Sequence, residues 1–288
     1  MYLYLNPRGG FNDILNRIEA SIEYCIKTNR TLLIDTTKSC YKINFCDYFY
    51  FKNLNIHVIT DIKVIKNIVA NESLTIYPDV FKSRDIDTWK FKFLCSHNCF
   101  AEEATNRIMS LPDTQCNENI VIHVNCGNSD RVTLFKHLFF QQNIIDHVKQ
   151  TFSKLPKKYI CIQIRNTDRK CDYKGLYENN KELIHSYEAV YIATDDELSI
   201  TFFRDKGLNV FNFTEFPDAY TRTLICPETW IHSLHDSNIS SDIKIKNLIC
   251  DIYIIAMADE LLSNSKGGFI NLVRDIRNDM STIDNKFN

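Results

Sequence analysis

The chain has 288 residues, which at roughly 150 residues per domain is enough for one large domain or two modest ones with a full hydrophobic core. Hydrophobic residues make up 44% of the chain and aromatic residues 12%, and this composition excludes an intrinsically disordered protein. The 34 Lys and Arg residues nearly balance the 36 Asp and Glu residues, so we expect no nucleic-acid partner and no general attraction to an anionic membrane.

The cysteines and the apolar segments indicate where the protein works. Eleven cysteines in a chain of this length favour reduced thiols over a disulfide scaffold. Met1–Asn6 has the pattern of a strand and lacks the basic and apolar regions of a signal peptide. The longest apolar stretch, Leu248–Leu262, contains Asp251 and Asp259 and is too short to span a bilayer. We therefore expect a cytoplasmic protein without an integral membrane segment.

The first segment of the chain predicts a strand, a glycine turn, a helix and a second strand. Tyr2–Leu5 is the expected strand and Asn6–Gly10 the turn. Apolar residues then recur at helical spacing from Ile14 to Ile26, and Thr31–Ile34 is the next strand. This βαβ order favours a parallel sheet. Further strands are expected at 56–59, 74–77 and 120–124, and helices near 132–140 and 144–152.

The α/β rhythm restarts after Leu155-Pro156-Lys157-Lys158, which has the composition of a linker. Strands are expected at 159–164, 190–193, 209–211 and 261–262, and helices at 197–206, 242–257 and 268–277. No internal repeat appears at solenoid periods. The simplest architecture is therefore two α/β domains, 1–154 and 155–288.

Open parallel sheets bind ligands at the carboxyl ends of their strands, and four polar motifs follow predicted strands. The first, Arg8–Asp13, contains two of the seven glycines, which allow close backbone approach and leave helix N–H groups open to an anion or a hydroxyl. A tight turn with Asn12 or Asp13 as helix cap explains this motif equally well. The chain lacks the G-x-G-x-x-G dinucleotide fingerprint and the phosphate-binding P-loop.

The second motif is a dense set of charges that directly follows strand 159–164. Arg165 lies at the strand end, where a guanidinium can hold a pyrophosphate by paired hydrogen bonds. Asp168 and Asp172 are carboxylates that can orient this guanidinium or act as a base. The alternative is a solvated charged loop.

The third and fourth motifs also follow strands. Asp195 and Asp196 can accept hydrogen bonds from a base or a ribose, or they can cap the helix that starts at Glu197. Ser263–Phe269 is a loop of small residues that opens a helix, and such a loop can hold phosphate oxygens. Lys266 adds a positive charge to it, although a plain flexible loop has the same composition.

The order of these motifs resembles that of a known family. Gln163–Asp168, Ala193–Asp196 and Ser263–Phe269 are similar to the motifs of GDP-fucose-dependent fucosyltransferases, of the α1,6-fucosyltransferase and nodulation type. Gly9–Asp13 and Asn29–Leu33 resemble the N-terminal half of such enzymes. The resemblance implies a GT-B fold, in which an N-terminal acceptor-side domain and a C-terminal nucleotide-sugar-binding domain, both Rossmann-like, face each other across a cleft.

The resemblance also implies an activity and a site. We expect inverting, metal-independent transfer of L-fucose from GDP-fucose to a hydroxyl of a glycan or glycolipid acceptor, with no cofactor besides the donor substrate. Arg165 would bind the diphosphate, and Asp195 and Asp196 would line the nucleoside pocket. The expected donor-binding residues are Gly9, Gly10, Asn12, Arg165, Thr194, Asp195, Asp196, Ser265, Gly267, Gly268 and Phe269, and the expected catalytic residues are Arg165, Asp168 and Asp172.

The sequence departs from the family pattern at three places. Gln163 stands where the motif has His, and Asn166 stands where α1,6-fucosyltransferases have a second Arg, for which Arg169 or Lys170 can compensate. Tyr173 occupies the spacing of the family's proposed catalytic Glu. Two alternatives therefore stay open, namely a glycosyltransferase with another nucleotide sugar and a non-catalytic nucleotide- or glycan-binding protein on the same scaffold.

Two weaker candidates concern metal and sugar binding. Cys95-Ser96-His97-Asn98-Cys99, together with Cys116, lacks a second ordered ligand pair, which favours buried thiols over a zinc site. Trp89 and Trp230 can stack on a sugar, but we expect them in the core.

Overall fold

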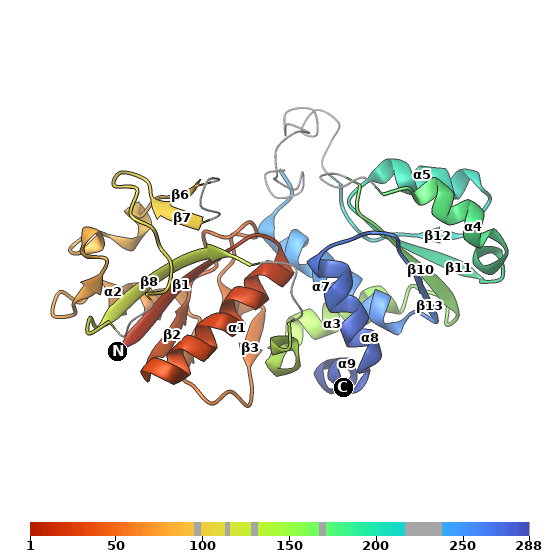
Figure 1. Cartoon of the computed structure of the whole chain (residues 1–288). Coiled ribbons are helices and arrows are strands. Elements are labelled where there is room, and N and C mark those ends of the chain that lie inside the picture. The colour runs from red at the N-terminus through yellow and green to blue at the C-terminus, as the bar shows by residue number, and fades with distance from the viewer. Residues whose placement is uncertain (95–98, 113–115, 128–131, 167–170, 217–237, 288) are drawn as a thin grey trace. The chain divides into compact units, whose positions relative to one another are not determined.

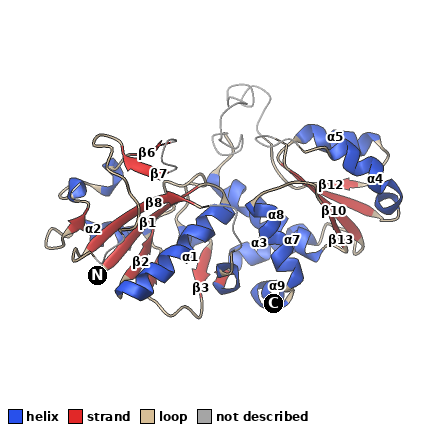
Figure 2. Cartoon of the chain, viewed as in Figure 1, coloured by secondary structure: helices blue, strands red, loops and turns tan. Residues whose placement is uncertain are grey.

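The chain forms two compact units, Met1–Gln141 and Gln142–Asn288 (Figure 1). The computed structural model describes all residues except 95–98, 113–115, 128–131, 167–170, 217–237 and 288. Each unit contains a parallel sheet with helices, which confirms the predicted α/β class (Figure 2). The division comes ahead of the expected linker at 155–158, because α3 (Gln142–Phe152) packs on α7 (Ser241–Met257), with the rings of Phe152 and Tyr253 5.1 Å apart.

The sheet of unit 1 has five parallel strands in the order β4-β2-β1-β8-β5. Helix α1 (Phe11–Thr28) packs against β1, β2 and β8 and presents an apolar stripe to the sheet. The strands are β1 (Tyr2–Arg8), β2 (Thr31–Ile34), β4 (Val58–Ile59), β5 (Ile76–Tyr77) and β8 (Ile120–Cys126).

Strand β1 runs to Arg8, so the turn predicted from residue 6 is wrong for its first three residues. The pairing with β2 ends at Leu5, and beyond that point only β8 pairs with β1, with Pro7 opposite Asn125. Pro7 lacks a backbone N–H and is tolerated in a strand where one side needs no ladder hydrogen bond. The extension places Arg8 at the carboxyl edge of the sheet.

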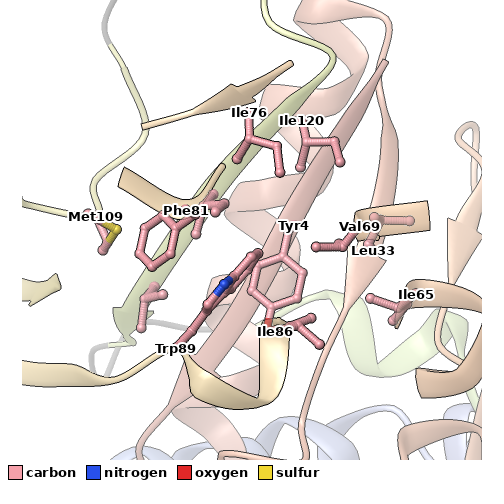
Figure 3. Packing of buried hydrophobic residues seen from close by; sticks show 12 residues of the cluster. Tyr4, Leu33, Ile65, Val69, Ile76, Phe81, Ile86, Trp89, Met109 and Ile120 are labelled. Atoms are coloured by element: carbon pink, nitrogen blue, oxygen red, sulfur yellow. The ribbon is translucent and has the colours of Figure 1, made fainter. Parts of the chain in front are cut away.

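The face of this sheet opposite α1 carries an aromatic core (Figure 3). The rings of Tyr4 and Trp89 meet edge to face at 5.3 Å between centroids, and Phe81 lies 4.7 Å from Trp89. Trp89 is 2% exposed, which confirms its expected place in the core. Ile65 and Val69 of α2 (Ile62–Val69) belong to the same cluster.

Two antiparallel strand pairs in unit 1 were not predicted. The pattern at 132–140 indicated a helix, but the chain forms a short 3₁₀ turn, η5 (Leu134–His137), and strand β9 (Leu138–Phe140). β9 pairs with β3 (Phe49–Phe51), and the rings of Tyr50 and Phe139 stack across the pair at 5.8 Å, a contact that favours strand over helix. The other pair is the hairpin of β6 (Phe91–Leu94) and β7 (Cys99–Glu102). The described residues of unit 1 also form the short 3₁₀ helices η1 (Phe45–Asp47), η2 (Asp79–Phe81) and η3 (Ile86–Thr88).

The sheet of unit 2 has four parallel strands in the order β12-β11-β10-β13. Alternate residues of β10 and β11 pack on the two helix layers, as expected for a sheet buried on both faces. One layer is α4 and α5, and the other is α7 with α3 and α8 on it. The bounds are β10 (Tyr159–Ile164), β11 (Ala189–Thr194), β12 (Val210–Phe211), β13 (Glu260–Leu262), α4 (Tyr173–His185), α5 (Glu197–Asp205), α8 (Gly268–Asn278) and α9 (Ser281–Phe287).

The expected elements of unit 2 agree with the structure to within one residue at each end, except that α3 starts two residues before the expected helix at 144–152 and that α4 and α9 were not predicted. Within the described ranges, no helix combines the length and the apolar character that crossing a bilayer requires.

His123 makes unit 1 sensitive to acid. Its ring is 2% exposed, Nδ1 faces the carbonyl oxygen of Met109 at 2.8 Å, and burial lowers its pKa to about 4. As the pH falls from about 6.5 to about 4, this histidine becomes protonated in the unfolded chain but stays neutral in the folded chain. Unit 1 therefore loses stability. Between pH 7 and pH 5 we expect the free energy of unfolding, measured with urea, to fall by about 2 kcal/mol. His123→Gln should remove this pH dependence. His57→Gln, at an exposed histidine of the same unit, should leave the loss unchanged.

Asp251 gives unit 2 the opposite response. Tyr191 donates a 2.5 Å hydrogen bond to Asp251, and burial raises the pKa of this carboxyl group to about 7. As the pH rises from about 4 to 7, the unfolded chain releases a proton that the folded chain keeps, so stability falls. The free energy of unfolding of Asp251→Asn should exceed that of the wild type by on the order of 2 kcal/mol at pH 8 and by much less at pH 4. An equal gain in stability at both pH values would contradict this account. The same gain in Asp146→Asn, at an exposed carboxylate of α3, would contradict it as well.

Candidate functional site

The strand order of unit 2 selects one position for a ligand. The chain leaves β10 for β11 on one side, and β13 lies on the other side, so the order reverses at β10. In open α/β sheets, ligands bind outside the carboxyl ends of the strands at such a switch point. Arg165 directly follows β10, and Ser263 directly follows β13. The second and fourth sequence motifs therefore meet at the switch point.

A chain of hydrogen bonds joins the two strand ends. Ser263 Oγ donates to the amide oxygen of buried Gln163 at 2.8 Å and accepts from the N–H of Ser265 at 3.1 Å. Ser265 Oγ in turn accepts from the N–H of Arg165 at 3.1 Å. Ser265 is 9% exposed, so this contact is sheltered from water. The backbone from which the Arg165 side chain projects is thereby held against the β13–α8 loop.

Asn166 ties the third motif to the same place. Its N–H donates to Asp195 Oδ1 and its side-chain amide donates to Asp196 Oδ2, both at 2.7 Å. Asp196 also caps α5, because its other oxygen accepts from the N–H of Leu198 at 3.1 Å. Asp196 is thus a helix cap, one of the two readings of its sequence position, and at the same time a tie between the β10 and β11 ends.

A third tie closes the cluster on the side of α4. Asn264 Oδ1 accepts a hydrogen bond from the thiol of Cys171 at 2.5 Å, and Asn264 Nδ2 donates to the carbonyl oxygen of Asp172 at 2.9 Å. Burial raises the pKa of Cys171, so this thiol stays protonated at neutral pH. Asp172 caps α4 by accepting from the N–H of Gly175 at 2.9 Å. The structure therefore gives Asp172 a structural contact beside any chemical role.

The start of α8 supplies N–H groups at this edge. Gly267 occupies the N-cap position with φ of 147°, a value that favours glycine, and it carries no side-chain cap. The first turn of α8, which includes Gly268 and half-buried Phe269, therefore presents N–H groups that no cap side chain occupies. Such a helix end, with exposed Lys266 beside it, is suited to an anion.

Unit 1 has its own switch point, between β1 and β8, and the first motif lies there. Gly9 has φ of 91°, and a Cβ at this residue would lie 2.5 Å from Cys126 Sγ and 2.7 Å from Asp13 Oδ2. Gly127 is equally constrained, because a Cβ there would lie 2.4 Å from the carbonyl oxygen of Asp13. Both glycines are needed for close packing of the β1–α1 turn against the β8 end.

The predicted site residues form one group in unit 2 and a second group in unit 1. Hydrogen bonds through the backbone of Arg165 and through Asn166 bring Arg165, Asp195, Asp196 and Ser265 together in unit 2, and Thr194 closes the β11 turn by accepting from the N–H of Asp196 at 3.0 Å. Gly9, Gly10 and Asn12 lie at the edge of unit 1, where Asn12 is 5% exposed and the N–H of Gly10 donates to Asp13. Asp168 lies outside the described residues.

Sequence reasoning missed the residues that connect the loops. Asn264 and Cys171 lay inside or beside the motifs but showed no periodicity that marked them as partners. Gly127 lay outside the four sequence motifs. Among the residues that the structure describes, no three His, Cys, Asp or Glu side chains are grouped to hold a metal ion, and most of the Cys95–Cys99 cluster lies outside them.

Two units, each with a parallel sheet, helices and polar residues at its switch point, define a Rossmann-like α/β fold. Three solved structures share the fold across almost the whole chain. The NodZ α-1,6-fucosyltransferase soaked with GDP-fucose superposes with a TM-score of 0.55 at 16% identity, covering 94% of this chain and 91% of that chain. NodZ from Bradyrhizobium gives 0.56 at 16% identity, covering 94% and 92%.

The third structure is POFUT1 in complex with GDP-fucose, which superposes with a TM-score of 0.53 at 12% identity and covers 94% of this chain and 92% of that chain. No family model matches the sequence, and no curated protein matches it. These likenesses establish the fold, and they confirm the fold that the sequence motifs implied.

Proposed function

We propose that the protein is a glycosyltransferase that transfers L-fucose from GDP-fucose to a glycan or glycolipid hydroxyl, with inversion and without a metal ion. The observation that carries the proposal is the switch point of unit 2. There, hydrogen bonds join Arg165 to Ser265 and Asn166 to the Asp195–Asp196 pair at one sheet edge, and α8 starts shortly after Ser265. NodZ and POFUT1, which share the fold, were solved with GDP-fucose.

The site provides what departure of GDP requires. As the bond between the sugar and the β-phosphate breaks, negative charge develops on the phosphate while the sugar becomes oxocarbenium-like. Arg165 and the N–H groups at the start of α8 would stabilise that charge. Asp195 would accept hydrogen bonds from the nucleoside. The acceptor hydroxyl attacks the opposite face of the anomeric carbon, and Asp168 or Asp172 is the carboxylate proposed to take its proton.

Two of the three departures from the family pattern have structural roles that are compatible with this proposal. Gln163 is 6% exposed and holds Ser263, so a neutral amide replaces the motif His as an anchor of the β13–α8 loop. Asn166 uses its amide to hold Asp196, so it contributes order rather than the charge of a second Arg. Neutralising the negative charge of the donor diphosphate then depends chiefly on Arg165.

The test is release of GDP from GDP-fucose, measured with GDP-mannose and UDP-glucose in parallel and with EDTA present in one arm. We expect turnover of GDP-fucose that EDTA leaves intact, with a change of anomeric configuration in the sugar product by NMR. Turnover of another nucleotide sugar in its place would identify a different transferase. Binding of GDP without turnover of any donor would instead indicate a non-catalytic nucleotide-binding protein.

A further inference from the structure

Two half-buried cations, Arg8 and Lys38, lie together at the carboxyl edge of the unit 1 sheet. Arg8 ends β1 at the switch point, and its guanidinium donates to the carbonyl oxygen of Lys38. The Lys38 ammonium donates to the carbonyl oxygens of Ile86 at 2.6 Å and Trp89 at 2.9 Å. Both cations are therefore fixed in position at an edge where α/β sheets bind ligands.

The positive charge of this pair is not neutralised by a salt bridge to any residue that the structure describes. Asp35 attracts both cations and offsets one of their two positive charges, while its oxygens accept hydrogen bonds from Tyr4 at 2.5 Å and from the N–H and hydroxyl of Thr37 at 2.9 and 2.6 Å, so one positive charge of the pair remains. Burial lowers the pKa of Arg8 and of Lys38 despite that attraction. An anion at this edge would relieve the cost of burying them.

Three buried polar atoms beside the cations lack partners among the described residues. They are the donors Arg8 Nε and Trp89 Nε1 and the acceptor Asn6 Oδ1. Asn6 is fully buried and Trp89 is 2% exposed, and each is nevertheless left with an unused hydrogen-bonding atom. Asn6 and Arg8 alternate with Tyr4 along β1, so they share the face of the sheet on which Trp89 packs (Figure 3). Unused buried donors in a native protein call for an explanation, and a bound polar ligand is one.

The β6–β7 hairpin adds an aromatic wall. The Arg8 guanidinium lies 6.0 Å from the ring centroid of Phe91 and 5.8 Å from that of Phe100. Phe93 pairs with Phe100 across the hairpin at 5.2 Å and is 45% exposed. Ligand sites typically combine such apolar walls with a few fixed polar groups.

We infer that this edge of unit 1 binds an anionic group, a phosphate or a carboxylate, carried by the glycan acceptor. Arg8 and Lys38 supply the charge, Trp89 Nε1 donates a hydrogen bond, and the Phe91, Phe93 and Phe100 rings flank the sugar. The role as an acceptor site rests on the proposed function, whereas anion binding itself does not.

The indole N–H of Trp89 is a built-in reporter for the test. The chain has two tryptophans, so ¹H–¹⁵N spectra of the full-length protein show two indole signals, and Trp230→Phe assigns them. We would titrate inorganic phosphate, D-glucuronate and neutral D-glucose at constant ionic strength, without nucleotide. A saturable shift of the Trp89 signal is expected with phosphate or glucuronate and not with glucose. The anion that acts more strongly identifies the acceptor group as phosphate or carboxylate.

Arg8→Gln should weaken the apparent affinity by about 10- to 100-fold, the effect of losing a charge-assisted hydrogen bond. Lys38→Met provides a second variant, and Arg107→Gln, at an exposed Arg over the ring of Tyr77, is the matched control that keeps the affinity. No saturable shift with either anion would overturn the inference. Wild-type affinity in both Arg8→Gln and Lys38→Met would also overturn it. If the shift is present but no nucleotide sugar is turned over, the anion site stands and the proposed transferase function fails.

Discussion

Replacing Arg165 by Ala lowers the turnover of GDP-fucose by about 100- to 1000-fold, the cost of removing one preorganised group that stabilises developing charge. The β10 end is held to Ser265 through the backbone N–H of residue 165, and this bond remains in the variant. The loop geometry should therefore persist, and the loss should come from the missing guanidinium. The measurement is the rate of GDP release under saturating donor, together with the dissociation constant of GDP.

Arg204→Ala is the matched control for this experiment. Arg204 is exposed in the last turn of α5, and helices of such a fold run against the strands, which puts this turn near the amino edge of the sheet. The control should keep the wild-type rate. If Arg165→Ala and Arg204→Ala have the same activity, the diphosphate is not bound at the β10 end.

Replacing Arg30 by Met destabilises unit 1 by about 4 kcal/mol, the range found when one partner of a buried charged network is removed. Arg30 is 3% exposed and lies at the amino edge of the sheet. Its guanidinium donates to the carbonyl oxygens of Glu118 at 2.9 Å, Tyr2 at 3.2 Å and Cys116 at 2.5 Å. Methionine keeps the aliphatic stem but leaves these partly buried carbonyls without the guanidinium donor.

Urea unfolding followed by tryptophan fluorescence measures this loss, because Trp89 lies in the core of unit 1. Lys27→Met removes a nearby positive charge from the exposed last turn of α1 and should change stability by less than about 0.5 kcal/mol. A small effect of Arg30→Met, similar to that of Lys27→Met, would show that water replaces the guanidinium at these carbonyls.

The fold of unit 2 was predictable because its elements obey local rules. β10 is an uninterrupted apolar strand and α7 has helical periodicity, and both were placed to within a residue. Unit 1 was harder to predict, since β4 and β5 have two residues each and depend on pairing with longer neighbours. The helix predicted near 132–140 failed because the aromatic residues of β9 pack better against β3, which is distant in the sequence.

The position of the site was predictable, but its internal order was not. Arg165, Asp195 and Ser265 each follow a strand, so the sequence indicated a common sheet edge. The contact of Asn166 with both aspartates joins segments about thirty residues apart, and that of Ser265 with Arg165 joins segments about a hundred apart. Neither contact leaves a trace in local spacing. The role of Arg30 was likewise invisible, because its partners are backbone carbonyls rather than side chains.

The central claim is that unit 2 binds the diphosphate of GDP at the carboxyl ends of β10 and β13. A crystal structure of the full chain with GDP tests it most directly. The account predicts that the Arg165 guanidinium lies within hydrogen-bonding distance of a phosphate oxygen and that the first N–H groups of α8 face the same diphosphate. GDP bound elsewhere on the protein, with Arg165 free of phosphate, would contradict the account.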